Sequence, residues 1–229
     1  MKTILKHIAS QNNFNCLDSK PLSGGDINEV FLLNCSEENF VVKINSASKF
    51  PALFEAEASG LRLLKQNSGF KIPAVIGSLP QQNNFCSSAS EFYITQRLEP
   101  QFKMAADNGF NFKNLEKFFK NISEEISNEA PALVHGDLWN GNYMVSKIGE
   151  AVLIDPAVAY APREMDIAMM KLFGGFSEEI FSNYNAAFPL GEGWKERLPL
   201  WQLYYLLVHL NLFGSGYLSQ VNSAIKKYS

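Results

Sequence analysis

The sequence predicts an α+β protein whose first hundred residues are rich in strands and whose remainder is mainly helical. In the N-terminal half, the short apolar runs 29–34 and 39–45 flank the polar turn CSEE, a pattern typical of a β-hairpin. After residue 100, apolar residues recur at helical spacing instead, most clearly in 115–126. Because 46% of the 229 residues are hydrophobic, the chain can bury a sizeable core.

The N-terminal half is predicted to contain one helix between its strands. Residues 54–66, FEAEASGLRLLKQ, carry apolar side chains at helical period. Residues 91–100, EFYITQRLEP, are predicted as a further strand that ends in a linker at Glu99–Pro100. Small-molecule sites often lie where such a β-rich half meets a helical half.

The C-terminal half is predicted to form four helices, at 115–126, 164–173, 177–188 and 195–213. The most apolar segment, 198–214, contains polar residues and is shorter than the ~20 residues that a membrane span needs. We therefore expect a core helix that ends at Gly214, and no membrane association.

The composition and charge of the chain argue against several classes of partner and site. The net charge is −3 and the pI about 5.7, without a basic stripe, so nucleic acid is not an expected partner. The three cysteines form no CxxC pair, which suits a reducing cytoplasm better than a zinc site or a disulfide framework. The N-terminal MKTILKHIAS does not resemble a signal peptide, because Lys6 and His7 interrupt its apolar run.

The chemistry is concentrated in LVHGDLWNGNYMV, residues 133–145. His135-Gly136-Asp137, followed four residues later by Asn142, matches the spacing of the kinase catalytic loop H-R-D-x-x-x-x-N, with glycine in place of arginine. Phosphoryl transfer needs a carboxylate to accept the proton of the acceptor hydroxyl and an oxygen ligand for Mg²⁺ nearby. Asp137 is the predicted base and Asn142 a predicted metal ligand, whereas His135 is expected to be a structural hydrogen-bonder.

A second metal ligand is predicted from the hairpin that follows. YMVS and AVLID flank a turn at 147–150, and a turn centred on Ile148–Gly149 pairs residue i with residue 297−i. Asn142 would then lie opposite Asp155, and both side chains would converge at the open end of the hairpin. The alternative is a surface hairpin with solvated ends.

Three weaker signals point to nucleotide binding. Glu57 lies on the apolar stripe of helix 54–66, where it needs a partner, and Lys43 on the preceding strand could provide one. Alternatively, Glu57 lies at the edge of the stripe and reaches solvent. Gly24 and Gly25 in PLSGGDIN could present main-chain N–H groups to phosphates, or could simply form a turn between strands.

These motifs, with LIDPAVAYAPREMDIAM and PLGEGWKERLPLWQLYYLLVHLNLFGSGYL, resemble the fructosamine kinase (ketosamine-3-kinase) family, in the aminoglycoside- and choline-kinase-like branch of the protein-kinase fold. The resemblance implies two lobes, 1–98 for ATP binding and 99–229 for catalysis and substrate, with ATP held at a hinge that includes Gln96 and Leu98. It implies transfer of the γ-phosphoryl group of ATP, with Mg²⁺, to the O3 hydroxyl of a ketosamine, as a step in deglycation.

The resemblance also assigns roles to single residues. Lys43 would hold the α- and β-phosphates, Glu57 would orient Lys43, and Asn142 and Asp155 would bind magnesium. Asp166 would accept hydrogen bonds from the catalytic-loop backbone, whereas Arg163 and Glu164 match the same motif without an evident role.

The sequence departs from the family in two places. Asp26 stands where some members carry a cysteine linked to redox-sensitive dimerisation, so no such switch is expected. The segment between 100 and 131 is interpreted as shortened, and part of the sugar-binding wall would be missing. Alternatives are therefore a kinase for an aminoglycoside or choline-like acceptor, and a non-catalytic nucleotide-binding module. The expected partner is a small-molecule or protein-bound ketosamine, and a monomer is expected rather than an obligate oligomer.

Overall fold

The computed structural model describes residues 2–22, 29–36, 38–44, 53–67, 86–127 and 129–229. They form two compact units, residues 1–53 and 54–229. Within the described residues, no helix combines the length and the apolar character needed to cross a bilayer.

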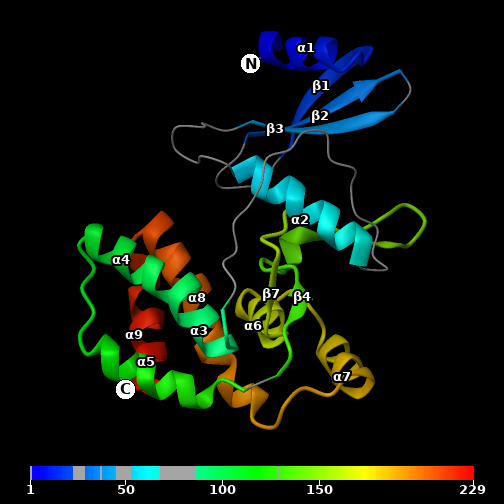
Figure 1. The fold of residues 1–229 in the computed structure, drawn as a ribbon. Coiled ribbons are helices and arrows are strands. Elements are labelled where there is room, and N and C mark those ends of the chain that lie inside the picture. Colours follow the sequence, from blue (N-terminus) through cyan, green and yellow to red (C-terminus); the bar gives the residue numbers. More distant parts are fainter. Residues whose placement is uncertain (1, 23–28, 37, 45–52, 68–85, 128) are drawn as a thin grey trace. The chain divides into compact units, whose positions relative to one another are not determined.

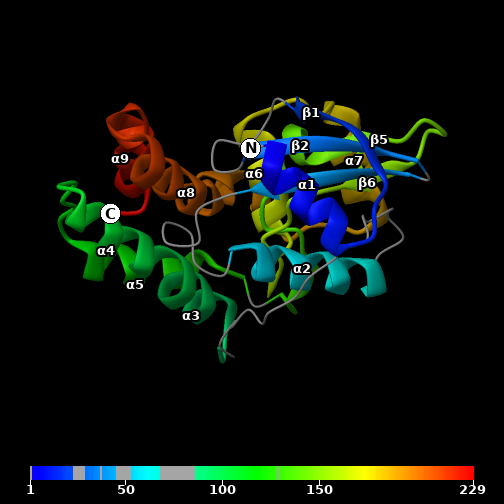
Figure 2. The same ribbon diagram turned by 90° about the horizontal axis from the view of Figure 1, so that it is seen from above.

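The first unit is a three-stranded antiparallel sheet with one helix (Figures 1 and 2). The predicted hairpin is confirmed, because β2 pairs with β3 in antiparallel register, with Asn34 opposite Asn39. The helix and the first strand of this unit were not predicted from the sequence. The elements are α1 (Lys2–Gln11), β1 (Cys16–Leu22), β2 (Glu29–Cys35) and β3 (Asn39–Ile44).

A small apolar cluster holds α1 against this sheet. Leu5 and Ala9 of α1 are buried together with Leu33 of β2, and Phe14 stacks on Phe40 with ring centroids 3.8 Å apart. The helix therefore covers one face of the sheet through its apolar side, as expected for an amphipathic helix.

The strands β1 and β2 place two thiols opposite each other. Cys16 and Cys35 are register partners at one end of the antiparallel pair, and both are free cysteines. Burial raises the pKa of the Cys35 thiol, and the neighbouring Cys16 adds to this shift.

The second unit is mainly helical, and the helices predicted at 54–66, 115–126, 164–173, 177–188 and 195–213 are confirmed. The major helices are α2 (Leu53–Asn67), α3 (Ala89–Tyr93), α4 (Glu99–Asp107), α5 (Leu115–Glu125), α6 (Glu164–Leu172), α7 (Glu178–Ala187), α8 (Trp194–Phe213) and α9 (Leu218–Lys227). Two short antiparallel strand pairs lie between α5 and α6 in the sequence. The outer pair is β4 (Ala132–Val134) with β7 (Ala159–Ala161), and the inner pair is β5 (Tyr143–Val145) with β6 (Ala151–Leu153).

The strand predicted at 91–100 is wrong. These residues form the end of α3, a π-helical turn at Ile94–Leu98, and the start of α4, so the chain is continuously helical. The side chains of Tyr93 and Leu98 are fully buried in the core of this unit. An apolar run of this length fits a buried helix as well as a strand, and here packing against α8 decides in favour of the helix.

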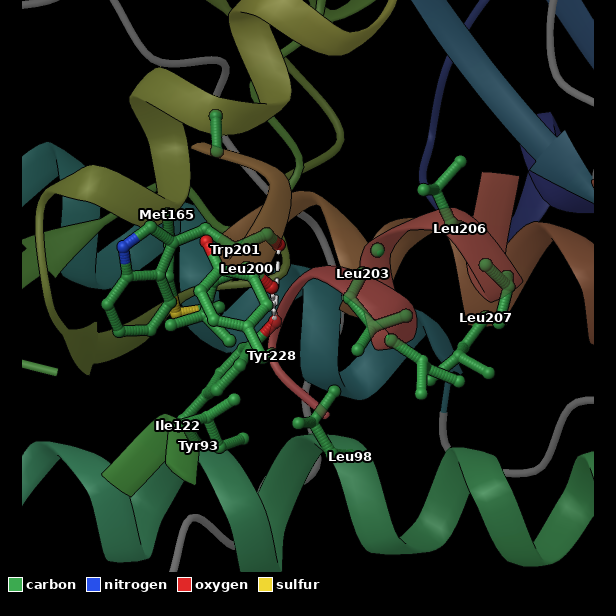
Figure 3. Packing of buried hydrophobic residues seen from close by; sticks show 14 of the residues in the cluster. Tyr93, Leu98, Ile122, Met165, Leu200, Trp201, Leu203, Leu206, Leu207 and Tyr228 are labelled. Atoms are coloured by element: carbon green, nitrogen blue, oxygen red, sulfur yellow. Dashed lines mark hydrogen bonds between the residues drawn. The ribbon is translucent and has the colours of Figure 1, made fainter. Parts of the chain in front are cut away.

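The core of the second unit is built around α8 (Figure 3). Trp201 packs edge-on against Tyr93, with ring centroids 4.6 Å apart. The Tyr93 hydroxyl donates to the carbonyl of Leu200 at 2.6 Å and accepts from the main-chain N–H of Tyr204 at 3.3 Å. Those two groups would otherwise bond to each other in α8, so the hydroxyl fixes the position of Tyr204 relative to α3.

Candidate active site

The loop after β4 carries the motif residues, and helix α6 holds that loop in place. The Asp166 carboxylate, in the first turn of α6, accepts the main-chain N–H of His135 at 2.7 Å and that of Gly136 at 2.8 Å. This is the role that the sequence predicted for Asp166. Two charge-assisted bonds from consecutive amides fix the direction in which the next residue, Asp137, leaves the strand.

Gly136 is required by the path of the backbone. Its φ is +81°, and a Cβ at this position would lie 2.0 Å from the carbonyl oxygen of Ala157. The main-chain N–H of Ala157 donates to the carbonyl of His135 at 2.8 Å, so the two segments are joined at this point. The close contact explains why glycine replaces the arginine of the protein-kinase motif.

His135 has the structural role predicted for it. It is 2% exposed, and burial lowers the pKa of its imidazole to about 4, so the ring is neutral at pH 7. Nε2 lies 3.0 Å from the carbonyl oxygen of Ile154, which requires a proton on Nε2. The ring therefore ties the catalytic loop to the strand that precedes Asp155 and is not available as a base.

Asp137 has the properties of a general base. Burial raises the pKa of its carboxyl to about 6; the hydrogen bond from Asn142 opposes this shift, and the nearby charges of Asp155 and Asp166 add to it. In the described part of the chain, no cationic side chain forms an ion pair with Asp137. A carboxylate whose pKa lies close to neutral accepts a proton more effectively than an ordinary one.

Asn142 joins the two aspartates. Its side-chain Nδ2 donates to the Asp137 carboxylate at 3.0 Å and to the Asp137 carbonyl at 2.8 Å, and lies 3.5 Å from the carbonyl oxygen of Asp155. Asn142 is only 5% exposed. The three predicted residues are therefore brought together in one place within the second unit.

The predicted register of the hairpin is wrong by one residue. Tyr143 pairs with Leu153, and the carbonyl of Asn142 accepts from the N–H of Ile154, so Asn142 faces Ile154 and not Asp155. The main-chain N–H of Ser146 donates to the carbonyl of Glu150, so the turn consists of residues 147–149 and not of the predicted 147–150. Asp155 still approaches Asn142, because its φ of +55° turns the chain out of the strand at that residue.

The donor set fits a magnesium ion. The Nδ2 of Asn142 donates to Asp137 and lies near the main-chain carbonyl of Asp155, so its amide oxygen and the Asp155 carboxylate are the two oxygen donors that could bind a cation. Mg²⁺ usually binds through one or two protein oxygens together with substrate phosphates, and not within an all-protein cage. The described residues contain no group of three or more His, Cys, Asp or Glu placed to hold a metal.

The other predicted nucleotide residues have different outcomes. Gly24 and Gly25 lie outside the described residues. Lys43 lies on β3 of the first unit and Glu57 on α2 of the second, so their pairing stays a prediction. The nucleotide contacts expected of Gln96 and Leu98 stay predictions, but the strand on which they were placed is a helix. A hinge strand offers unpaired backbone groups to a base, whereas these residues are helical and Leu98 is fully buried.

Arg163 and Glu164, which had no predicted role, anchor the start of α6. The Glu164 carboxylate accepts two bonds from the Arg197 guanidinium, at 2.6 and 2.9 Å, and one from the Trp201 indole N–H at 2.7 Å. Arg163 pairs with Glu129 and donates to the carbonyls of Phe188 and Pro189. Both residues fix the helix that carries Asp166. These partners lie far from α6 in the sequence, so only the three-dimensional structure reveals both roles.

The aromatic surface beside the site was only partly foreseen. Trp139, in the catalytic loop, is 40% exposed, and its ring packs edge-on against Phe173, with centroids 6.3 Å apart. The ring of His209 on α8 also packs against Phe173, with centroids 4.8 Å apart. Trp139 lies within the motif stretch 133–145, whereas Phe173 and His209 carry no local signal in the sequence.

Comparisons with known proteins agree with this geometry. The sequence model of the fructosamine kinase family matches residues 1–76 and, separately, residues 65–229. A probable ketoamine kinase of Enterococcus faecium is 34% identical over 261 aligned positions, which cover 91% of this chain and 94% of the relative. A Thermobifida fusca protein assigned as a fructosamine-3-kinase superposes with a TM-score of 0.83 at 27% identity, over 100% of this chain and 99% of that one.

The wider branch of the fold is also recognisable. The choline kinase LicA of Streptococcus pneumoniae superposes with a TM-score of 0.65 at 14% identity, over 100% of this chain and 98% of that one, and LicA has also been solved in complex with AMP. At this identity the likeness shows the fold alone. The fold is the protein-kinase-like fold of the aminoglycoside phosphotransferase and choline kinase type, with an N-terminal β-sheet followed by a mostly helical region.

The two-part match locates the segment that this chain lacks. The alignment with the Enterococcus relative spans 261 positions, more than the 229 residues of this chain, so the relative has a segment without a counterpart here. The two matches to the family meet at residues 65–76. The missing segment therefore lies before α3, and the shortening predicted between 100 and 131 is wrong. Matched along its whole length, the chain belongs to the fructosamine kinase family.

Proposed function

We propose that this protein transfers the γ-phosphoryl group of ATP to the O3 hydroxyl of a ketosamine, such as a ribulosamine or fructosamine adduct. The observation that carries the proposal is the contact of Asn142 with both aspartates, which unites a base and two oxygen donors. Kinship with ketoamine kinases supports the acceptor class, and the AMP bound to LicA supports a nucleotide donor.

Each residue then has a defined task. The Asp137 carboxylate accepts the proton of the acceptor hydroxyl as its oxygen bonds to the γ-phosphorus, while the bond to the β-phosphate oxygen breaks and releases ADP. The amide oxygen of Asn142 and the Asp155 carboxylate would hold magnesium, which neutralises charge on the phosphates when bound. Asp166 and His135 keep the loop in position. The exposed ring of Trp139 offers a face on which a sugar can stack.

The acceptor is tested by following ADP release with Mg·ATP. The panel contains a ribulosamine, a fructosamine, an aminoglycoside and choline, with a reaction lacking acceptor as the blank. Release with the ketosamines alone supports the proposal, and ³¹P NMR of the product should locate the phosphate on O3. Release with the aminoglycoside or choline would favour the substrate-divergent alternative. No release, with nucleotide still bound, would favour a non-catalytic module.

The metal assignment has a separate test. Asp155→Ala should raise the Mg²⁺ concentration needed for half-maximal rate by at least about 10-fold, because one of two protein ligands is lost. Asp107→Ala, at the exposed end of α4, is the matched control. Unchanged Mg²⁺ dependence in Asp155→Ala would contradict the assignment.

A role in deglycation of free or protein-bound adducts follows from the proposed reaction. Phosphorylation at O3 places a good leaving group on C3, next to the C2 carbonyl of the ketosamine. Loss of a proton from C1 then expels phosphate from C3, and hydrolysis by water of the imine that results releases the free amine. The predictions of a monomer and of a cytoplasmic location are retained with this proposal.

A further inference from the structure

A cavity of about 120 Å³ lies against the catalytic loop, entirely within the second unit. Gly136, directly before the base, forms one wall together with Ala157, and Arg97 and Tyr204 form another. The remaining lining is apolar, from Val134, Ala159 and Met165. Since a cavity needs roughly 10–15 Å³ of this kind of volume to hold one water molecule, there is room for a group the size of a carboxylate or a phosphate.

Arg97 is the one charged group that lines this cavity. Its guanidinium lies over the ring of Phe92 at 4.5 Å and near that of Tyr204 at 5.8 Å, and contacts with aromatic faces leave the N–H edge available. Of its five N–H donors, one is used within the described residues, from Nη1 to the carbonyl of Gln96 at 3.0 Å.

The other two arginines of the helical core differ in this respect. Arg163 is paired with Glu129, and Arg197 is paired with Glu164. In the part of the chain that the structure describes, no carboxylate forms an ion pair with Arg97. A half-buried cation that faces a cavity without a counter-ion is suited to bind an anion.

The position of Arg97 relates it to the acceptor. Burial raises the pKa of the Tyr204 phenol. The charge of Arg97 lowers this pKa and the charge of Asp137 raises it, so Tyr204 lies close to both residues. The Tyr93 hydroxyl fixes Tyr204 through its main-chain N–H. Because Gly136 and Asp137 are adjacent, with Cα atoms ~3.8 Å apart, an acceptor whose hydroxyl lies at Asp137 can extend a neighbouring group into the cavity.

We propose that this cavity, with Arg97 as its cation, is an anion subsite for the acceptor. This proposal rests on the proposed function and narrows it to ketosamines that carry a carboxylate or a phosphate. The carboxylate would come from an amine that is an amino acid, and the phosphate from the sugar. The planar guanidinium can bind either group through two parallel hydrogen bonds.

The test compares three ketosamines of the same sugar: the glycine adduct, the uncharged glycinamide adduct, and the glycinamide adduct of the sugar phosphate. The wild-type protein should show a kcat/KM roughly 10- to 100-fold higher for at least one anionic acceptor than for the glycinamide adduct. The preferred anion identifies its source. Arg97→Gln should remove this preference and leave kcat/KM for the glycinamide adduct within about 3-fold.

Two variants make the result specific. Arg97→Lys keeps the charge without the planar fork and should retain part of the preference. Lys103→Gln removes an exposed cation from α4 and should change nothing, which controls for net charge. Thermal denaturation verifies folding; if Arg97→Gln does not fold, the wild-type preference and Arg97→Lys still decide.

Three outcomes would overturn the inference. Equal kcat/KM for neutral and anionic acceptors would remove the subsite while leaving the ketosamine kinase intact. A rise in KM for ATP in Arg97→Gln, with acceptor preference unchanged, would assign Arg97 to the nucleotide. Failure to phosphorylate any ketosamine would reject the proposed function, and the subsite with it.

Discussion

Two clusters of charged residues in the second unit differ in how their charge is balanced. At the start of α6, Glu164 is 1% exposed and is paired with Arg197, and Arg163 is paired with Glu129. In the catalytic loop, the side-chain partner of Asp137 is the amide of Asn142. The ion pairs at the start of α6 stabilise the structure. A carboxylate that is hydrogen-bonded only to a neutral amide keeps its negative charge uncompensated, so it can still attract a proton or a metal ion.

The sharpest test of this difference is Asp137→Asn. Asparagine keeps the shape of the side chain but cannot accept the proton, so kcat should fall by about 10²- to 10⁴-fold. Stability and nucleotide affinity should change little, because no ion pair of the described residues is broken. Steady-state kinetics and nucleotide titration measure both, with the exposed Asp107→Asn as control. A near-normal kcat would show that another group is the base.

Arg197→Met should instead lower the stability of the fold. It leaves the Glu164 carboxylate buried without its cation, which should lower the free energy of unfolding by about 3–5 kcal/mol. Denaturant unfolding measures this loss. The double variant Arg197→Met/Glu164→Gln removes the stranded charge while keeping an acceptor for Trp201, and should recover part of the stability. Equal stability of the single and double variants would contradict a structural ion pair.

Gly136→Ala should lower both the stability of the fold and kcat. A Cβ would meet the Ala157 carbonyl, so the loop must shift, at a cost of about 1–3 kcal/mol and with a lower kcat. Gly149→Ala is a matched control: its φ of +84° is similar, but nothing lies within 4 Å of the added Cβ. Differential scanning calorimetry and kinetics should therefore show a larger effect at 136. Equal losses at both positions would mean that backbone strain alone is responsible.

The smallest effect is expected on the surface. Lys171 pairs with Glu178, whose side chain is 83% exposed. Glu178→Gln should lower the free energy of unfolding by less than about 1 kcal/mol and leave kcat unchanged, because water screens exposed pairs. A larger loss in denaturant unfolding would show that surface charge contributes more to α6 than the buried pairs suggest.

The parts of the fold that depend on local pattern could be predicted from the sequence. The hairpin at 29–45 and the helices from 115 onward follow from apolar periodicity, and the spacing of Asp137 and Asn142 follows from the motif. Residues 91–100 could not be assigned in this way, because a buried helix and a strand share their composition and only α8 distinguishes them. The hairpin register failed for a related reason. The number of residues in the turn decides the register, and one residue fewer shifts the pairing by one position. The positive φ of Asp155 still brings this residue close to Asn142.

The facing thiols of β1 and β2 have a practical consequence. Opposed residues of antiparallel strands have Cα atoms about 4.5–5.5 Å apart, within the range that a disulfide can span. Cys16 and Cys35 could thus be linked by a mild oxidant without a cross-link from outside the chain. The link would pin the first two strands together and could be reversed with a reductant. Activity with the link closed and open would then report whether this sheet must deform during turnover.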